Sequence, residues 1–121
     1  MKWAQHSVVL RGAFHSIQEQ ARAWGGFNAE RTYGYLRLLA PAEQQAGETI
    51  GIAVLSNFTA DRQCYPLFLP SSEEQGELQR LLHVTLHTPD AAPRELLYAF
   101  QPWAPLIIEL APYSVQLVEL R

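Results

Sequence analysis

Hydrophobic residues come in short runs along this chain, and glycine and proline interrupt them at close intervals. The clearest run is Thr49–Phe58, in which apolar side chains fall on both faces of an extended chain. A short apolar run of this kind is typical of a β-strand that is covered on both sides. The segment is therefore predicted to be the strongest strand in the chain.

Further runs with strand character are spread over the whole sequence, each bounded by turn residues. They are Ser7–Arg11, Ala13–Ile17, Arg31–Ala40, Gln63–Leu69, Glu95–Phe100, Leu106–Leu110 and Tyr113–Leu120. No clear helix of ten or more residues separates them, as a parallel α/β sheet would require. About seven or eight short strands in this arrangement predict an all-β protein, folded as an antiparallel Greek-key β-sandwich.

Two segments are harder to assign. Leu78–Leu86 fits helical spacing in its first half and strand spacing in its second half, where a β-branched pair favours a strand. Gln18–Glu30 is polar and contains a glycine pair, which is typical of a turn rather than a helix. At most one frayed helical turn is expected there, over Gln18–Ala23.

Composition and charge narrow the classes of function. The 121 residues are 48% hydrophobic and 17% charged, enough to bury a core, so residues 1–121 are expected to form one domain. Nine basic and twelve acidic residues, with Lys2 the only lysine, argue against a nucleic-acid-binding surface. No apolar run approaches the roughly 20 residues of a membrane span. The single cysteine and the lack of a signal-peptide core fit a cytoplasmic protein, with a secreted or periplasmic parent left open.

Residue types that often carry catalysis form no recognisable constellation. Asp61 is predicted to satisfy turn amides, and Cys64 to be a small buried residue. His83 and His87 have metal-site spacing on a helix, but in the predicted strand they lie too far apart for one ion. Asn57 begins a glycosylation tripeptide, which is interpreted as structural. We expect no catalytic residue, cofactor or metal in this chain.

The three tryptophans are the candidate binding residues. Trp3, Trp24 and Trp103 all fall in predicted loops or at the terminus. Exposed indole rings can stack on sugars or pack against a neighbouring domain. The alternative is that each ring closes one end of the sandwich.

Three parts of the sequence, in order, resemble one family. They are Leu10–Phe14, then Tyr33–Arg37 with Ile52–Thr59, and finally Leu110–Leu120. Together they are similar to the strand motifs "L-R-x-G-x-F", "a-Y-x-R … v-v-x-N-F-S" and "L-x-P-y-S-a-x-v-l-x-L" of the α-amylase superfamily of glycoside hydrolases. In that family these motifs belong to the C-terminal β-sandwich, domain C, and here they extend over nearly the whole chain.

The resemblance implies a sandwich that packs against a catalytic (β/α)8 barrel and stabilises it. The catalytic carboxylates of the family lie on that barrel, so no catalytic residue carries over. The roles that do carry over are structural, at Gly12, Tyr35, Arg37, Asn57, Phe58 and Pro112. The parent reaction implied is retaining cleavage or transfer of α-glucosidic bonds.

Three functions follow from these observations. The leading one is a non-catalytic C-terminal domain of an α-amylase-type glycosidase or transglycosidase, with the barrel as its partner and α-glucan as a further candidate ligand. The second is a free-standing carbohydrate-binding module that uses Trp24 or Trp103, and the third is a protein-interaction β-sandwich. A domain that packs on a barrel should carry an apolar face, with candidates Trp3, Phe14, Trp24 and Phe27.

Overall fold

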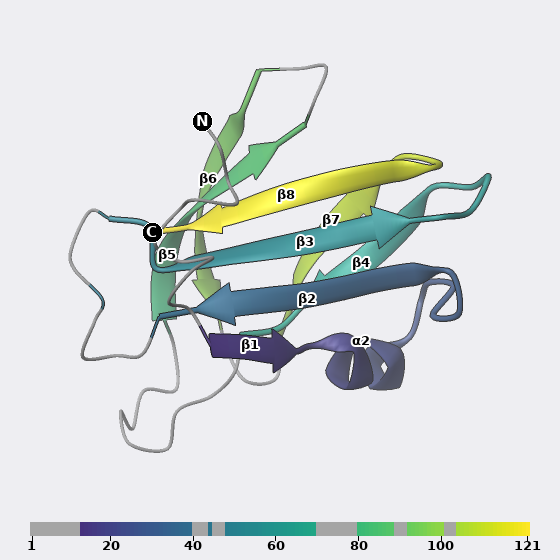
Figure 1. Cartoon of the computed structure of the whole chain (residues 1–121), viewed down its shortest axis with the longest axis horizontal. Coiled ribbons are helices and arrows are strands. Elements are labelled where there is room, and N and C mark those ends of the chain that lie inside the picture. Colours follow the sequence, from purple (N-terminus) through teal and green to yellow (C-terminus); the bar gives the residue numbers. More distant parts are fainter. Residues whose placement is uncertain (1–12, 40–43, 45–47, 70–79, 89–91, 101–103) are drawn as a thin grey trace.

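A computed structural model describes residues 13–39, 44, 48–69, 80–88, 92–100 and 104–121 of the chain. These residues form eight strands and one short helix (Figure 1). In chain order the elements are β1 (Ala13–Ser16), α2 (Gln18–Trp24), β2 (Thr32–Leu38), β3 (Gly51–Asn57), β4 (Gln63–Leu67), β5 (Arg80–His87), β6 (Arg94–Phe100), β7 (Leu106–Leu110) and β8 (Ser114–Leu120).

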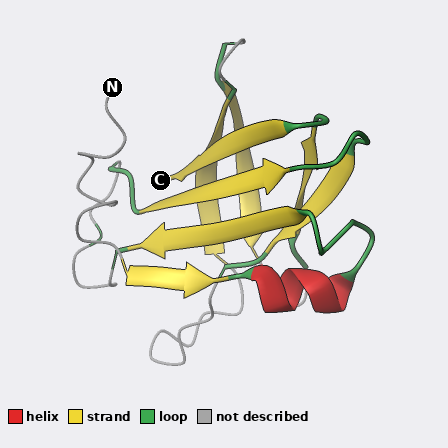
Figure 2. Cartoon of the chain, turned by 45° about the vertical axis from the view of Figure 1, so that its right-hand side comes forward, coloured by secondary structure: helices red, strands yellow, loops and turns green. Residues whose placement is uncertain are grey.

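The strands form two antiparallel sheets of unequal size, and the predicted all-β sandwich is confirmed. One sheet has six strands in the order β1-β2-β3-β8-β5-β6, and the other has the two strands β4 and β7. The pairs β3–β8, β4–β7 and β5–β6 are nested, and the middle pair lies in the smaller sheet. Pairing of β8 with β5 completes a Greek-key winding. Figure 2 shows the helix at the edge of the larger sheet, beside β1 and β2.

The core fills the space between the sheets. Alternate residues of β2, β3, β8 and β5 point inward from the larger sheet, and Tyr65, Leu67, Ile108 and Leu110 meet them from the smaller sheet. The largest fully buried side chains are Tyr65, Ile17, Leu36, Leu55, Leu67, Leu110, Leu120, Val84, Val118, Asn57 and Thr32. Ile52 and Leu39 make a second small cluster with Leu117, so β3 contributes to apolar packing on both faces, as predicted.

The predicted strands that fall in the described residues are confirmed within two residues at each end. The ambiguous segment Leu78–Leu86 becomes strand β5 over Arg80–His87, which the β-branched pair in its second half favoured. The predicted strand Ser7–Arg11 and Gly12 lie outside the described residues. So do Trp3 and Trp103.

The prediction for the polar segment after β1 is right only for its second half, where the glycine pair is followed by turns. Gln18–Trp24 forms a helix of seven residues, and its Ala21 is fully buried against the core. Ile17, just before the helix, is also buried. Ile17 and Ala21 therefore pack the helix against the core, although most residues of the segment are polar. Gly25, at φ 83°, ends the helix because glycine adopts this conformation without steric cost.

The side chain of Gln18 connects this helix to both sheets through hydrogen bonds. Its Nε2 donates hydrogen bonds to the carbonyl oxygens of Thr32 at 2.8 Å and Ala29 at 3.3 Å. Its Oε1 accepts from the amide of Gly34 at 3.1 Å and from the hydroxyl of Tyr65 at 2.9 Å. Burial raises the pKa of Tyr65, so its hydroxyl stays protonated and acts as a donor.

Cys64 is exposed, and the prediction that it is buried is wrong. It lies in β4 next to Tyr65, whose side chain fills the core. Successive side chains of a strand point to opposite faces, so Cys64 must face away from the core. Its cross-strand partner on that outer face is Glu109 of β7.

Candidate binding surface

The structure places the predicted aromatic residues in different surroundings. Trp24 ends helix α2 rather than lying in a loop, and its ring is 53% exposed with its edge against Phe68 at a centroid distance of 5.9 Å. Phe14 is 59% exposed on β1. Phe27 instead packs on the ring of Tyr65 at 5.1 Å, so it belongs to the core and not to a bare face. The three predicted face residues that the structure describes, Phe14, Trp24 and Phe27, therefore do not form one surface.

A continuous apolar surface does lie on the outer face of the larger sheet. The rings of Phe14 and Tyr35 stack at 5.6 Å, and those of Tyr33 and Phe58 lie 6.0 Å apart. Val115 joins them through the register, because Tyr33 pairs with Ser56 and Ser56 with Val115. The exposed fractions are Phe14 59%, Tyr33 48%, Tyr35 40%, Phe58 53% and Val115 48%. We call these five residues the aromatic surface.

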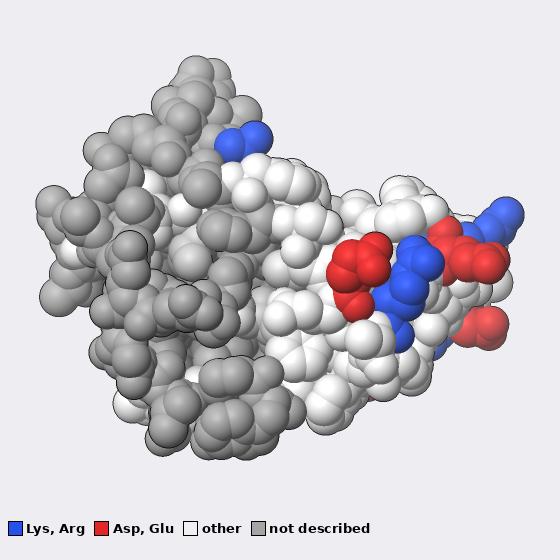
Figure 3. Space-filling view, turned by 90° about the horizontal axis from the view of Figure 1, so that it is seen from below, with Lys and Arg blue, Asp and Glu red and all other residues white. Residues whose placement is uncertain are grey.

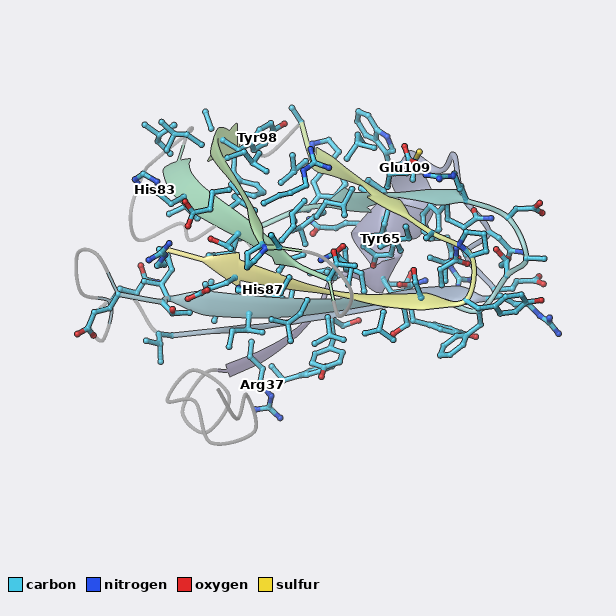
Figure 4. The ribbon with its side chains drawn as sticks, turned by 90° about the horizontal axis from the view of Figure 1, so that it is seen from above. Arg37, Tyr65, His83, His87, Tyr98 and Glu109 are labelled. Atoms are coloured by element: carbon cyan, nitrogen blue, oxygen red, sulfur yellow. The ribbon has the colours of Figure 1, made fainter. Side chains whose placement is uncertain are left out.

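Alternation along β2 explains why the rings face outward. Leu36 and Leu38 are buried in the core, so Tyr33 and Tyr35 must lie on the opposite face. Arg37 follows on that face and points away from both sheets (Figure 4). The alternation of side chains along β2 is present in the sequence and is the signal that identifies Tyr33, whereas the binding residues expected from the sequence were tryptophans.

Charge is unevenly spread over the described surface. In Figure 3 most of the visible Lys, Arg, Asp and Glu side chains lie at the end of the molecule where α2 lies, and one basic group lies apart from them. The exposed rings of the aromatic surface are of the kind that is typical of a contact with another protein or domain.

The strongest polar cluster in the described part of the chain is a buried corner around Asn57. Its Nδ2 donates to the carbonyl oxygens of Asp61 at 2.9 Å, Ala111 at 2.9 Å and Leu110 at 3.3 Å. Its Oδ1 accepts from the amide of Thr59 at 2.9 Å and from the Thr59 hydroxyl at 2.7 Å. The corner ties the end of β3 to the turn between β7 and β8. With its side chain 1% exposed, Asn57 is structural, as predicted.

The turn opposite Asn57 completes this corner. Tyr113 has φ 50°, and its amide donates to the carbonyl of Thr59 at 3.1 Å. The Ser114 hydroxyl donates to the carbonyl of Ala111 at 2.6 Å. Asp61 contributes its backbone carbonyl, which accepts from Asn57 and from the Thr59 hydroxyl. In the turn that follows β3, the backbone groups of Thr59 and Asp61 are thus bonded by the side chains of Asn57 and Thr59. The prediction that the Asp61 side chain bonds the turn amides is wrong.

A second polar cluster centres on Glu119 of β8. His87 Nε2 lies 3.0 Å from Glu119 Oε1, and the Thr49 hydroxyl donates to Oε2. Burial would raise the pKa of Glu119, but the hydrogen bonds from Thr49 and His87 and the charges of Arg121 and His87 outweigh it and lower the pKa. His83 is exposed on the same strand as His87. Among the described residues, no group of three His, Cys, Asp or Glu side chains is placed to hold a metal ion.

Glu119→Gln is expected to make the protein less stable at neutral pH and less sensitive to acid. The pKa of Glu119 is lower in the folded state, so ionised Glu119 stabilises the fold above its unfolded pKa, and this stabilisation is lost as the pH falls through the folded pKa. We expect a loss of about 1 kcal/mol at pH 7 and a smaller loss toward pH 3. Urea unfolding across this range measures both.

The matched control for this prediction is Glu109→Gln. Glu109 is paired with Arg62 at an exposed position, where ion pairs contribute little. An equal pH dependence in the two variants would contradict the role assigned to Glu119.

No helix of the described residues has the length and apolar character needed to cross a membrane. In comparisons with known proteins, no family model, no curated protein and no solved structure matches the chain significantly. The structure shows an all-β sandwich, and the resemblance to domain C remains a prediction.

Proposed function

We propose that this chain is a non-catalytic C-terminal β-sandwich domain of an α-amylase-type glycoside hydrolase or transglycosidase. In this role it packs against the catalytic (β/α)8 barrel of its parent protein and stabilises it. The parent acts on α-glucosidic bonds.

One observation carries the proposal. The segments Ile52–Thr59 and Leu110–Leu120, which hold two of the three parts of the resemblance, meet in space at the Asn57 corner. Their characteristic residues are the ones that make the contacts: Asn57 donates, Thr59 completes the network and Ser114 closes the turn. Segments about 50 residues apart thus act as one structural unit, which explains why these residue types occur together.

The aromatic surface supports the proposal that the chain packs against a catalytic barrel. A domain that packs against another domain needs an exposed apolar area, and interfaces are enriched in aromatic side chains. Phe14, Tyr33, Tyr35 and Phe58 supply four such rings on one sheet face. We assign this face to the barrel contact.

The test begins with the polypeptide that carries this sequence, isolated from its native source with an antibody against the chain. It is expected to cleave or transfer α-glucosidic bonds of maltoheptaose, whereas the isolated chain is expected to have no such activity. Introducing Tyr33→Ser with Tyr35→Ser into the parent should lower the temperature at which activity is lost. Leu97→Ser is the matched control, because Leu97 is 55% exposed on β6, the edge strand at the far end of the larger sheet from β1 and β2.

A native polypeptide without activity on α-glucosides would overturn the proposal. Activity that is equally heat-sensitive in the tyrosine variant and the Leu97 control would contradict the assignment of the face. A carbohydrate-binding module, the second candidate, is favoured by the exposed ring of Trp24. It would appear as retardation of the isolated chain in a starch gel that Trp24→Ala abolishes and Tyr113→Ala, at another exposed ring, does not.

A further inference from the structure

The unequal size of the two sheets leaves a cleft beside β7. This cleft has a volume of about 370 Å³ and lies between β7 and the inner face of β5, β6 and β8. Its lining is mixed: Leu86, Leu96, Leu106 and Ile108 contribute apolar side chains, and Thr88, Arg94, Glu109 and Gln116 contribute polar ones. The first three are only half-buried, although they pack against the core. An additional strand of the smaller sheet would cover them.

The backbone of β7 forms one wall of the cleft. The four consecutive residues 106–109 all line it, so the cleft follows the edge of the strand. Within the described residues β7 pairs with β4 alone, and its second edge has no strand beside it. Four residues of extended chain span about 13 Å. The cleft can therefore hold a short extended segment along its length.

Pro66 indicates which backbone groups face the cleft. It pairs with Ile107 in the β4–β7 ladder. Proline has no amide hydrogen and fits a ladder at a position whose N–H would point away from the partner strand. Neighbouring antiparallel pairs alternate between bonded and non-bonded, so Ile107 and Glu109 direct their N–H and C=O groups toward the open edge. A second extended chain could accept and donate hydrogen bonds there.

The side chains around the cleft distinguish among possible ligands. Gln116 is engaged, since its Nε2 donates to His87 O at 2.7 Å and its Oε1 accepts from Thr88 at 3.3 Å. Glu109 is paired with Arg62. Arg94 lines the cleft and has no ion pair within the part of the chain that the structure describes. A sugar would find few available polar partners here, whereas an apolar segment with an acidic group would match.

We propose that the open edge of β7 binds an extended peptide segment of a partner protein by strand addition. Main-chain hydrogen bonds to Ile107 and Glu109 hold the segment. Its alternate apolar side chains cover Leu86 and Leu96, and an acidic side chain pairs with Arg94. This mode of recognition combines backbone affinity with pockets for every second side chain.

The other open edges of the molecule are less suited to a peptide. β4 has a second edge without a described strand beside it, but none of its residues lines the cleft, and β1 and β6 are the edge strands of the larger sheet. Only the inward-facing residues Arg94 and Leu96 of β6 line the cleft, so the edge of that strand does not follow it. Among the described strands, only β7 has an open edge that lines the cleft, where apolar side chains lie together with Arg94. The peptide site is independent of the barrel contact proposed above, which lies on the outer face of the larger sheet.

The test selects ligands from a display library of short random peptides with the full chain as bait. Selected peptides are expected to alternate apolar and polar residues and to carry one Asp or Glu. Addition of such a synthetic peptide should slow hydrogen exchange at the amides of Ile107 and Glu109, measured by NMR. The same peptide with its backbone amides methylated should not bind, because strand addition requires its N–H groups.

Substitutions at Arg94 and Ile107 test the two contacts that the proposal assigns to the peptide. Arg94→Glu should weaken binding of the acidic peptide about tenfold and should select peptides with Lys or Arg instead. Ile107→Pro removes one edge amide and should abolish binding, whereas Ile107→Thr should retain it. No enrichment of peptides, protection at other amides, or binding that is indifferent to Arg94→Glu would each overturn the proposal. The charge reversal decides the question even if the proline variant fails to fold.

Discussion

Asn57→Ala is expected to lower the free energy of unfolding by about 3–4 kcal/mol. The side chain is 1% exposed and bonds the carbonyl groups of Asp61, Leu110 and Ala111 as well as the amide and hydroxyl of Thr59. Alanine would leave several of these groups buried without partners, at a cost of about 1–3 kcal/mol for each. Urea unfolding should show a lower midpoint with an unchanged slope, because the unfolded surface area stays the same.

Ser114→Ala is the matched control for this prediction. The Ser114 hydroxyl makes one exposed hydrogen bond in the same turn, so its loss should cost about 0.5–1 kcal/mol. Thr59→Val, combined with Asn57→Ala in a double-mutant cycle, should show a coupling of about 1 kcal/mol, since the two side chains bond each other. If Asn57→Ala costs no more than the serine control, the corner does not lock β3 to the β7–β8 turn.

The local pattern of apolar and turn residues predicts the strands of this protein but not its helix. Strand runs such as Thr49–Phe58 and Leu106–Leu110 have apolar residues at strand spacing between turn residues, and the structure confirms them. Helix α2 was missed because its stability comes from tertiary contacts, chiefly the burial of Ala21 and the bonds of Gln18. Neither contact can be recognised from the neighbouring residues in the sequence.

Of the two candidate binding sites, the aromatic surface could be predicted in part from the sequence, and the cleft beside β7 could not. The outward position of Tyr33 and Tyr35 follows from alternation with Leu36, so the aromatic surface was predictable in part. The contribution of Phe14 required the β1–β2 register, which pairs it with Arg37. The cleft beside β7 could not be predicted, because the number of strands in each sheet is set by long-range pairing rather than by local composition.

Gly34→Ala is expected to destabilise the protein by about 2–4 kcal/mol. A Cβ at this position would lie 2.5 Å from the Tyr65 hydroxyl, 2.6 Å from its ring carbon and 2.8 Å from Leu55. Tyr65 is fully buried and its hydroxyl bonds Gln18, so the ring cannot move without breaking that bond and repacking the core. Overpacking alone costs about 1–3 kcal/mol, and the lost hydrogen bond adds about 1 kcal/mol.

Gly51→Ala provides a control in the neighbouring strand. There a Cβ would meet Leu38 Cδ1 at 2.9 Å and Leu120 Cδ1 at 3.3 Å, the ends of flexible side chains that can rotate aside. We expect a change of less than about 1 kcal/mol for this variant. Tyr65→Leu removes the obstructing ring, so Gly34→Ala should cost much less in that background than in the natural one. Equal costs in the two backgrounds would show that the close approach of β2 to Tyr65 is not what requires glycine at position 34.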